Sequence, residues 1–294
     1  MKLIDEIFGK ECVCKGINKK GKCIIAEIDN KKYVIKNKSN DIEKIYDYLN
    51  SVKFEHYPKI LIKNNKYYVY EYIDDVISPI EEKACDMINL IGLLHSKTTY
   101  YKEMDINEYK KLFEDTVQKI EDVKTYYDKL IDSIERHMFM SPSEYLIARN
   151  ISKIFGALNY SKQNIIKWYN IVKSNNKKRV VRLYNNMDLN HVLRNSDLYL
   201  INWEKSINGS PILDLYNFYK MNYSISNFEQ LMKQYEDKYP LEEEEKILFY
   251  TLISIPNKIN FTFNEIINCK NIKKIVDYIY KSEILISQAY PTKK

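Results

Sequence analysis

The sequence predicts an α+β fold with two lobes, a small antiparallel β-sheet lobe followed by a larger, mainly helical lobe. Residues 1–75 contain short strand-like segments, whereas after Pro79 apolar residues recur every three or four positions. The chain has 294 residues, 45% of them hydrophobic, which is enough to fill a sizeable core. We therefore expect a β-rich lobe at 1–75 and a helical lobe at 76–294.

The small lobe is expected to hold five short strands and one helix. Polar turns, the first at 18–21, separate the strands and favour tight antiparallel hairpins. The helix covers 41–52, where apolar residues follow helical spacing and Ser39 or Asn40 is available as N-cap. The predicted strands are 11–17, 22–28, 32–36, 60–63 and 67–72.

The large lobe is expected to be helical apart from β-structure at 179–183 and 192–202. Apolar stripes at a spacing of three and four residues predict its helices. A β-rich lobe beside a helical lobe that holds one hairpin is compatible with a nucleotide clamp. The predicted helices are 80–96, 106–138, 143–158, 161–172, 211–221, 225–238, 242–254, 264–268 and 271–288.

Charge and hydropathy exclude several classes of partner. Lys and Arg number 46 and Asp and Glu 40, a net charge of +6, but the two signs are interspersed along the chain. Nothing therefore indicates a nucleic-acid partner. No apolar run approaches the roughly 18 residues of a membrane span, and the first residues do not resemble a signal peptide. We expect a cytoplasmic protein without a membrane partner.

The five cysteines are an odd number, which fits free thiols in a reducing compartment. Cys12, Cys14 and Cys23 lie close in the sequence, and alternation along a strand would place the first two on one face. A zinc site needs a fourth ligand, and Cys85 and Cys269 are far away. Apolar packing of these thiols is therefore favoured over a metal site.

The region 179–204 carries the residues that indicate a function. It contains VVRLYNNMDLNHVL at 180–193 and LYLINWE at 198–204. This region resembles the catalytic loop and metal-binding hairpin of the aminoglycoside phosphotransferase and choline kinase group, particularly its bacterial spore-coat kinase-like branch. That group's loop reads His-Gly-Asp-x-x-x-x-Asn-hydrophobic-Leu, and its hairpin ends in Ile-Asp-Trp-Glu or Ile-Asp-Phe. The resemblance implies a bilobal protein-kinase-like fold with the catalytic-loop hairpin at 179–204.

Four further segments resemble the same group and follow in the same order. VIK at 34–36 is similar to the strand that supplies the phosphate-binding lysine, here Lys36, and VYEYI at 69–73 is similar to the hinge between the lobes. LIGLLHS at 90–96 and PILDL at 211–215 are similar to the first large-lobe helix and to the element after the metal site. Together with the hairpin, these segments cover most of the chain.

The resemblance implies ATP as the cofactor, bound in the cleft between the lobes. Lys36 would pair with the nucleotide phosphates, with a plain strand-edge lysine as the alternative reading, and Glu71 and Ile73 would bind the cofactor at the hinge. Glu43 and Asp47 share one helix face, and Glu43 is slightly favoured as the carboxylate partner of Lys36. The first hairpin turn is poor in glycine, which reduces the expected strength of nucleotide binding.

Three positions depart from the family pattern. Aligning Val192 and Leu193 with the hydrophobic pair places Asn186 at the catalytic aspartate, and it places His191 and Asn202 at the two metal-binding positions. An amide cannot accept a proton at neutral pH, and a neutral oxygen attracts Mg²⁺ far less than a carboxylate does. Imidazole suits softer metals. We therefore expect weak or absent magnesium binding.

Three hypotheses follow, and the sequence leaves open whether the chain is an enzyme. The favoured one is a pseudokinase that acts as a binding or scaffold protein for a protein partner, in a spore-coat context. The alternative is an ATP-dependent phosphotransferase of a small hydroxylated or amino-containing metabolite, with a rearranged loop in which Asp188 is the base. The third is a protein that binds a small ligand between the lobes, lined by tyrosines such as Tyr100, Tyr101, Tyr126 and Tyr127.

Overall fold

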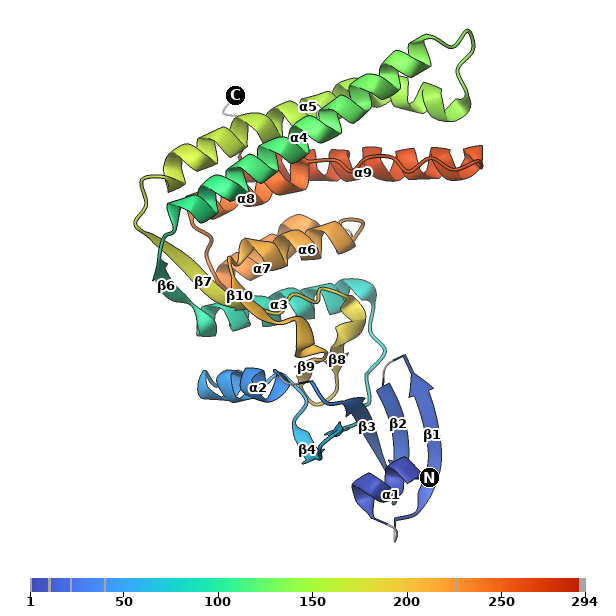
Figure 1. Ribbon diagram of the computed structural model, residues 1–294, viewed down its shortest axis with the longest axis vertical. Coiled ribbons are helices and arrows are strands. Elements are labelled where there is room, and N and C mark those ends of the chain that lie inside the picture. Colours follow the sequence, from blue (N-terminus) through green and yellow to red (C-terminus); the bar gives the residue numbers. More distant parts are fainter. Residues whose placement is uncertain (1, 10–11, 22, 40, 226, 291–294) are drawn as a thin grey trace. The chain divides into compact units, whose positions relative to one another are not determined.

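The computed structural model describes residues 2–9, 12–21, 23–39, 41–225 and 227–290, and the chain forms two compact units (Figure 1). The first unit combines Met1–Thr98 with Arg182–Ile207, and the second combines Thr99–Val181 with Asn208–Lys294. The first unit thus joins the β-rich segment to most of the hairpin region. The division into lobes at residue 75 stays a prediction. The α+β class is confirmed, because an antiparallel sheet lies near the N-terminus and helices dominate the rest.

An antiparallel sheet of five strands forms the first part of this first unit. Its order is β1-β2-β3-β5-β4, and all five predicted strands are present. The expected starts at Glu11 and Lys22 lie outside the described residues. The first turn lies later than predicted, because β1 continues to Lys20 and Gly21 adopts a positive φ of 59°. The strands are β1 Cys14–Lys20, β2 Cys23–Ile28, β3 Lys31–Asn37, β4 Ile60–Lys63 and β5 Tyr67–Glu71.

The two faces of this sheet have different roles because side chains alternate along each strand. Ala26, Ile35 and Val69 point to one face and form a buried core with Ile4 of α1 (Lys2–Phe8), a helix that the sequence did not predict. The residues between them point to the other face. The α2 helix (Ile42–Ser51) begins after Asp41, which makes no side-chain cap, so Ser39 is not its N-cap. The other candidate cap, Asn40, lies outside the described residues.

The predicted hairpin packs in the first unit beside α3 (Ile80–Thr98). Its strands β8 (Val192–Arg194) and β9 (Leu198–Leu200) are flanked by two single 3-10 turns, Leu189–His191 and Trp203–Lys205. The wholly buried Trp203 donates its indole N–H to the Leu200 carbonyl at 2.7 Å. Arg194 donates to Asp86 of α3 at 2.6 Å, and these bonds fix the hairpin on the helix.

The second unit is mainly helical. The long helices α4 and α5 form an antiparallel pair, and α5 also packs on α8 and α9 (Figure 1). A small sheet has the order β10-β7-β6. The helices are α4 Ile106–Glu135, α5 Pro142–Val172, α6 Ile212–Asn222, α7 Phe228–Lys238, α8 Glu243–Ser254 and α9 Glu265–Ala289, and the strands are β6 Tyr100–Glu103, β7 Lys177–Leu183 and β10 Ile207–Gly209.

Two helix breaks expected in this unit are wrong. The expected pair 143–158 and 161–172 is the single helix α5, and 264–268 with 271–288 is the single helix α9. Polar residues at 159–161 cause no break because Ser161 is buried and donates to the carbonyls of Ala157 and Thr251 at 3.0 and 3.3 Å. The short strands β6 and β10 were not predicted.

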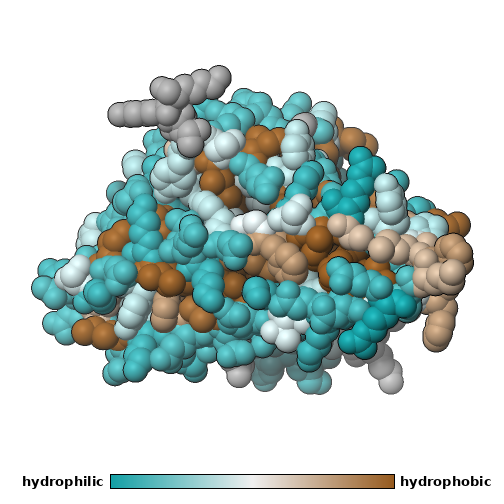
Figure 2. All heavy atoms as spheres, turned by 90° about the horizontal axis from the view of Figure 1, so that it is seen from above, coloured by the Kyte–Doolittle hydropathy of each residue, from teal (hydrophilic) through white to brown (hydrophobic). Residues whose placement is uncertain are grey.

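One face of the molecule shows how hydrophilic and hydrophobic residues are distributed on its surface. Figure 2 shows hydrophilic residues spread over the face in view, with hydrophobic residues between them. Among the described helices, none combines the length and apolar character needed to cross a bilayer.

Candidate functional site

A cavity of about 550 Å³ lies wholly within the first unit, between the sheet face opposite α1 and the β8–β9 hairpin. Strand register explains its lining on the sheet side. Cys23 pairs with Lys36 and Ile25 pairs with Val34 across β2 and β3, so these four side chains share one face. The sheet side of the cavity therefore combines an apolar section with one lysine, Lys36.

Lys36 faces the hairpin. Its ammonium donates to Asn202 Oδ1 and lies 3.4 Å from Glu204 Oε1. It also lies 5.9 Å from the centre of the Tyr70 ring, and its side chain is only 17% exposed. The structure thus brings together two residues that are 166 positions apart in the sequence.

Asn202 has a left-handed backbone, with φ 64° and ψ 59°, which Asn tolerates better than most residues do. Its main-chain carbonyl accepts a hydrogen bond from Asn186 Nδ2 at 3.1 Å. The candidate base position and one candidate metal position are therefore in direct contact. Both carry amides, so this contact brings no negative charge to the site.

His191 lines the same cavity and is half-buried. Its main chain is fixed, because the His191 N–H donates to the Asp188 carbonyl at 2.9 Å and its carbonyl accepts from the Ile201 N–H at 3.0 Å. Its ring Nδ1 is buried and has no hydrogen-bond partner among the described residues. A buried polar atom without a partner is costly, which makes this nitrogen a candidate contact for a ligand.

These residues do not fit a magnesium site. His191 offers a nitrogen, and the Asn202 oxygen is neutral and already accepts from Lys36. Magnesium prefers carboxylate and water oxygens in octahedral geometry. In the part of the chain that the structure describes, no three His, Cys, Asp or Glu side chains group to hold a metal.

Asp188, the alternative base, has a local structural contact. Its Oδ1 accepts from the backbone N–H and from the side-chain amide of Asn190, both at 2.9 Å. These bonds cap the 3-10 turn Leu189–His191, which places His191 at the cavity. To act as a base, Asp188 would have to give up these hydrogen bonds to Asn190.

Glu43 lies on α2 in a separate cluster. Its carboxylate accepts from the Tyr68 hydroxyl at 2.8 Å and from Lys63 at 3.1 Å, and it lies 3.4 Å from Lys38. The hydrogen bonds from Tyr68 and Lys63 lower the pKa of Glu43 to about 2. The structure pairs Lys36 with Asn202 and Glu204 instead. Glu43 as a partner of Lys36 was an expectation from the sequence alone.

The segment 69–73, which resembles a hinge, contributes to the lining of the cavity. Glu71, the last residue of β5, and Ile73, two positions after it, both line the cavity. The Tyr72 N–H between them donates to the Lys32 carbonyl at 3.2 Å, which holds this segment against β3. Main-chain groups of this segment are thus presented at a fixed position.

Two aromatic residues of the cavity had no assigned role in the sequence analysis: Tyr46, and Tyr70 within the segment 69–73. Their rings meet edge to face with centres 6.5 Å apart. Burial raises the pKa of both phenols, and the nearby Glu204 adds to this, so both stay neutral at physiological pH. Tyr46 could have been found, because it lies four residues after Ile42 on the predicted helix face.

Comparisons with known proteins give structural matches only. No family model matches the sequence, and no curated protein matches it significantly. An aminoglycoside phosphotransferase from Alicyclobacillus acidocaldarius matches with a TM-score of 0.68 at 10% identity, over 94% of this chain and 91% of that chain. AMP-bound spectinomycin phosphotransferase APH(9)-Ia matches with a TM-score of 0.52 at 13% identity, over 99% and 93%. Choline kinase LicA from Streptococcus pneumoniae gives 0.51 at 17% identity, over 99% and 92%.

Proposed function

We propose that this chain, which has the fold of the aminoglycoside phosphotransferases and choline kinases, is a pseudokinase that binds a nucleotide in the cavity of its first unit. One observation carries this proposal: the nearer hydrogen-bond partner of Lys36 is the neutral amide of Asn202, and the Glu204 carboxylate, 3.4 Å away and 40% exposed, compensates the lysine charge only in part. The charge of Lys36 is therefore available to an anion, while the carboxylates needed for transfer are replaced. The protein would act by binding or scaffolding, in the spore-coat context that the resemblance implies.

The cavity offers suitable surfaces for a nucleoside. Ile25, Val34 and Leu193 give apolar contacts for a base, and Tyr70 adds an aromatic surface. Main-chain groups at Glu71 and Ile73 would contact the edge of that base. Lys36 would meet a phosphate, since an ammonium is a strong donor to phosphate oxygens. The AMP bound to spectinomycin phosphotransferase supports a nucleotide as the ligand of this fold.

The residues at the aligned catalytic and metal-binding positions support the proposal that phosphoryl transfer has been lost. Transfer needs a group that orients or deprotonates the acceptor and metal ions that neutralise the developing charge. Asn186 cannot take a proton, and its amide is bound to the Asn202 carbonyl. We therefore infer nucleotide binding that does not require magnesium.

The alternative function, an ATP-dependent phosphotransferase with a rearranged loop, has one favourable observation. Glu204 places a carboxylate 3.4 Å from Lys36, close to the expected metal position. The proposed base Asp188 caps a turn, however, so the alternative needs this turn to open. Under the alternative, Asp188→Asn should abolish turnover and leave the fold intact, and turnover retained by this variant would refute it.

Calorimetric titration with ATP, with and without magnesium, tests the proposal. The expected result is binding in both conditions, lost in Lys36→Gln and kept in Lys38→Gln. Lys38 is a matched control because it follows β3 closely and lies near Glu43, 3.4 Å away. Binding only with magnesium would favour the phosphotransferase, and no binding would leave a kinase fold that acts through its surfaces.

A further inference from the structure

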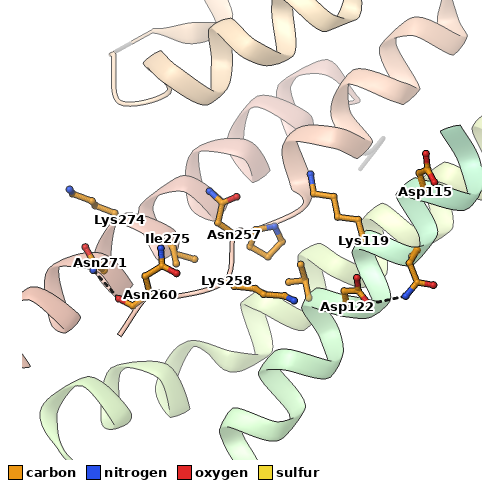
Figure 3. A pocket seen from close by; sticks show the side chains of 12 residues that line it. Asp115, Lys119, Asp122, Asn257, Lys258, Asn260, Asn271, Lys274 and Ile275 are labelled. Carbon is orange, nitrogen blue, oxygen red and sulfur yellow. Dashed lines mark hydrogen bonds between the residues drawn. The ribbon is translucent and has the colours of Figure 1, made fainter. Parts of the chain in front are cut away.

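A second cavity, of about 760 Å³, lies wholly within the second unit (Figure 3). It is bordered by α4, by α9 and by the segment 256–260 that precedes α9. None of its lining residues belongs to the first unit, so this inference does not rest on the proposed nucleotide function.

The segment 256–260 is held in place by hydrogen bonds that its main-chain carbonyl groups accept. The Tyr127 hydroxyl donates to the Asn257 carbonyl at 2.7 Å, and the Tyr126 hydroxyl donates to the Ile259 carbonyl at 2.8 Å. Asn271 Nδ2 donates to the Asn260 carbonyl at 3.3 Å. These tyrosines thus fix a segment whose Asn257, Lys258 and Asn260 side chains remain exposed at the cavity. The binding surface is preorganised, which reduces the entropy that a ligand must overcome.

Three lysines border the cavity from three different elements, Lys119 on α4, Lys258 on the segment and Lys274 on α9. None has a carboxylate within 4.0 Å among the residues that the structure describes. Lys119 and Lys258 instead lie 5.8 Å from the ring centres of Tyr216 and Tyr126. A ring face positions an ammonium without neutralising its charge.

Two other lysines of α4 differ from these three. Lys110 and Lys124 pair with carboxylates four residues later on the same helix, at 3.9 and 3.3 Å. Three lysines and two aspartates, Asp115 and Asp122, line the cavity, which leaves one net positive charge. A ligand with a single anionic group complements this charge, and a polycation does not.

The remaining polar lining consists of amides. Figure 3 shows Asn260 and Asn271 near Lys274, with Asn257 between them and Lys119. Each amide both donates and accepts, and the Asp122 carboxylate, which already accepts from Gln118 at 2.8 Å, has free acceptor capacity. We infer that this cavity binds a small polyhydroxylated anion of the sugar phosphate class, with the anionic group at the lysines and the hydroxyls at the amides.

Titration calorimetry of the full chain with glucose 6-phosphate as the probe tests this inference. We expect binding at least about tenfold tighter than that of glucose or inorganic phosphate, because both parts of the probe find partners. Lys119→Gln with Lys258→Gln should weaken it by at least about tenfold, since charged hydrogen bonds are lost. Lys110→Gln with Lys124→Gln removes the same amount of charge, from the helix α4 that also carries Lys119, and should have no effect.

Further variants separate the two cavities and the two parts of the ligand. Lys36→Gln should leave glucose 6-phosphate binding unchanged, and a loss there would overturn the assignment to the second unit. Asn257→Ala with Asn260→Ala should weaken the sugar phosphate and spare inorganic phosphate. Absence of saturable binding in the millimolar range, inorganic phosphate binding as tightly as the sugar phosphate, or equal weakening in the control lysine pair would overturn the inference.

Discussion

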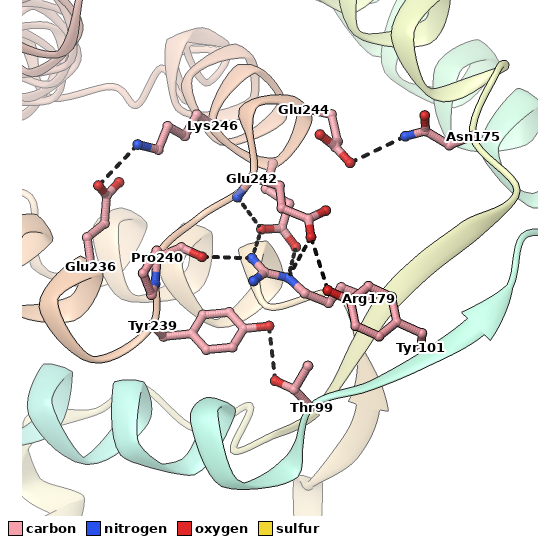
Figure 4. Close-up of polar contacts among 11 residues, drawn as sticks. Thr99, Tyr101, Asn175, Arg179, Glu236, Tyr239, Pro240, Glu242, Glu244 and Lys246 are labelled. Atoms are coloured by element: carbon pink, nitrogen blue, oxygen red, sulfur yellow. Dashed lines mark hydrogen bonds and ion pairs between the residues drawn. The ribbon is translucent and has the colours of Figure 1, made fainter.

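Two cationic clusters, one in each unit, differ in what neutralises the cation. In the second unit, Arg179 of β7 forms two hydrogen bonds with the Glu245 carboxylate, donates to the Pro240 carbonyl at 3.0 Å and lies 4.3 Å from the Tyr239 ring (Figure 4). Its side chain is 11% exposed and that of Glu245 is 9% exposed. In the first unit, Lys36 is almost as buried, at 17%, yet donates to the neutral amide of Asn202.

The difference separates a structural contact from a binding contact. A buried cation that faces a carboxylate has its charge fully compensated. The Arg179–Glu245 pair therefore joins β7 to the start of α8 and has no capacity to bind another anion. A buried cation that faces an amide has its hydrogen bond satisfied, but Glu204, which is 40% exposed, compensates its charge only in part. The arrangement in the first unit is therefore the one that suits a phosphate ligand.

Removal of the arginine should give the largest effect on stability. Arg179→Met keeps much of the side-chain volume but leaves the Glu245 carboxylate buried without its partner, at an expected cost of about 3 kcal/mol in the free energy of unfolding. Urea denaturation measures this cost. The control Lys233→Met breaks an exposed pair with Glu229 and should cost less than about 0.5 kcal/mol. A loss no larger than that of the control would show that the Arg179 contact is not structural.

Restoring carboxylates at the aligned positions of the first unit tests the same difference between the two cations. The triple variant Asn186→Asp, His191→Asn and Asn202→Asp supplies the oxygens that a magnesium ion prefers, so the affinity for magnesium–ATP should rise at least about tenfold. Calorimetry with and without magnesium measures it. Asn185→Asp with Asn195→Asp adds two charges outside the aligned positions and should not raise it. An unchanged affinity in the triple variant would argue against the alignment.

Local patterns predicted much of the first unit, and long-range contacts explain what was missed. The strand pattern at 32–36 matches β3, and the resemblance singled out Lys36 and Asn202 separately, with Glu43 as the favoured partner of the lysine. The left-handed backbone of Asn202 has no local signal, because many asparagines in this chain have ordinary conformations. The second cavity could not be predicted for a different reason, because the segment 256–260 is held by tyrosines about 130 positions earlier in the chain.

The smallest expected effect concerns Glu43, a surface carboxylate bound by Tyr68 and Lys63 and close to Lys38. Its pKa is lowered from 4.5 to about 2, so its stabilising effect is complete above 4.5 and is lost as the pH falls toward 2. The melting temperature of Glu43→Gln should therefore lie slightly below that of the wild type at neutral pH, and the gap should close between those two values. Glu55→Gln serves as the control, because the Glu55 carboxylate forms no ion pair with the residues that the structure describes, and it should show no such closing gap. A gap for Glu43→Gln that stays constant through this range would mean that the contacts of Glu43 act through shape and not through charge.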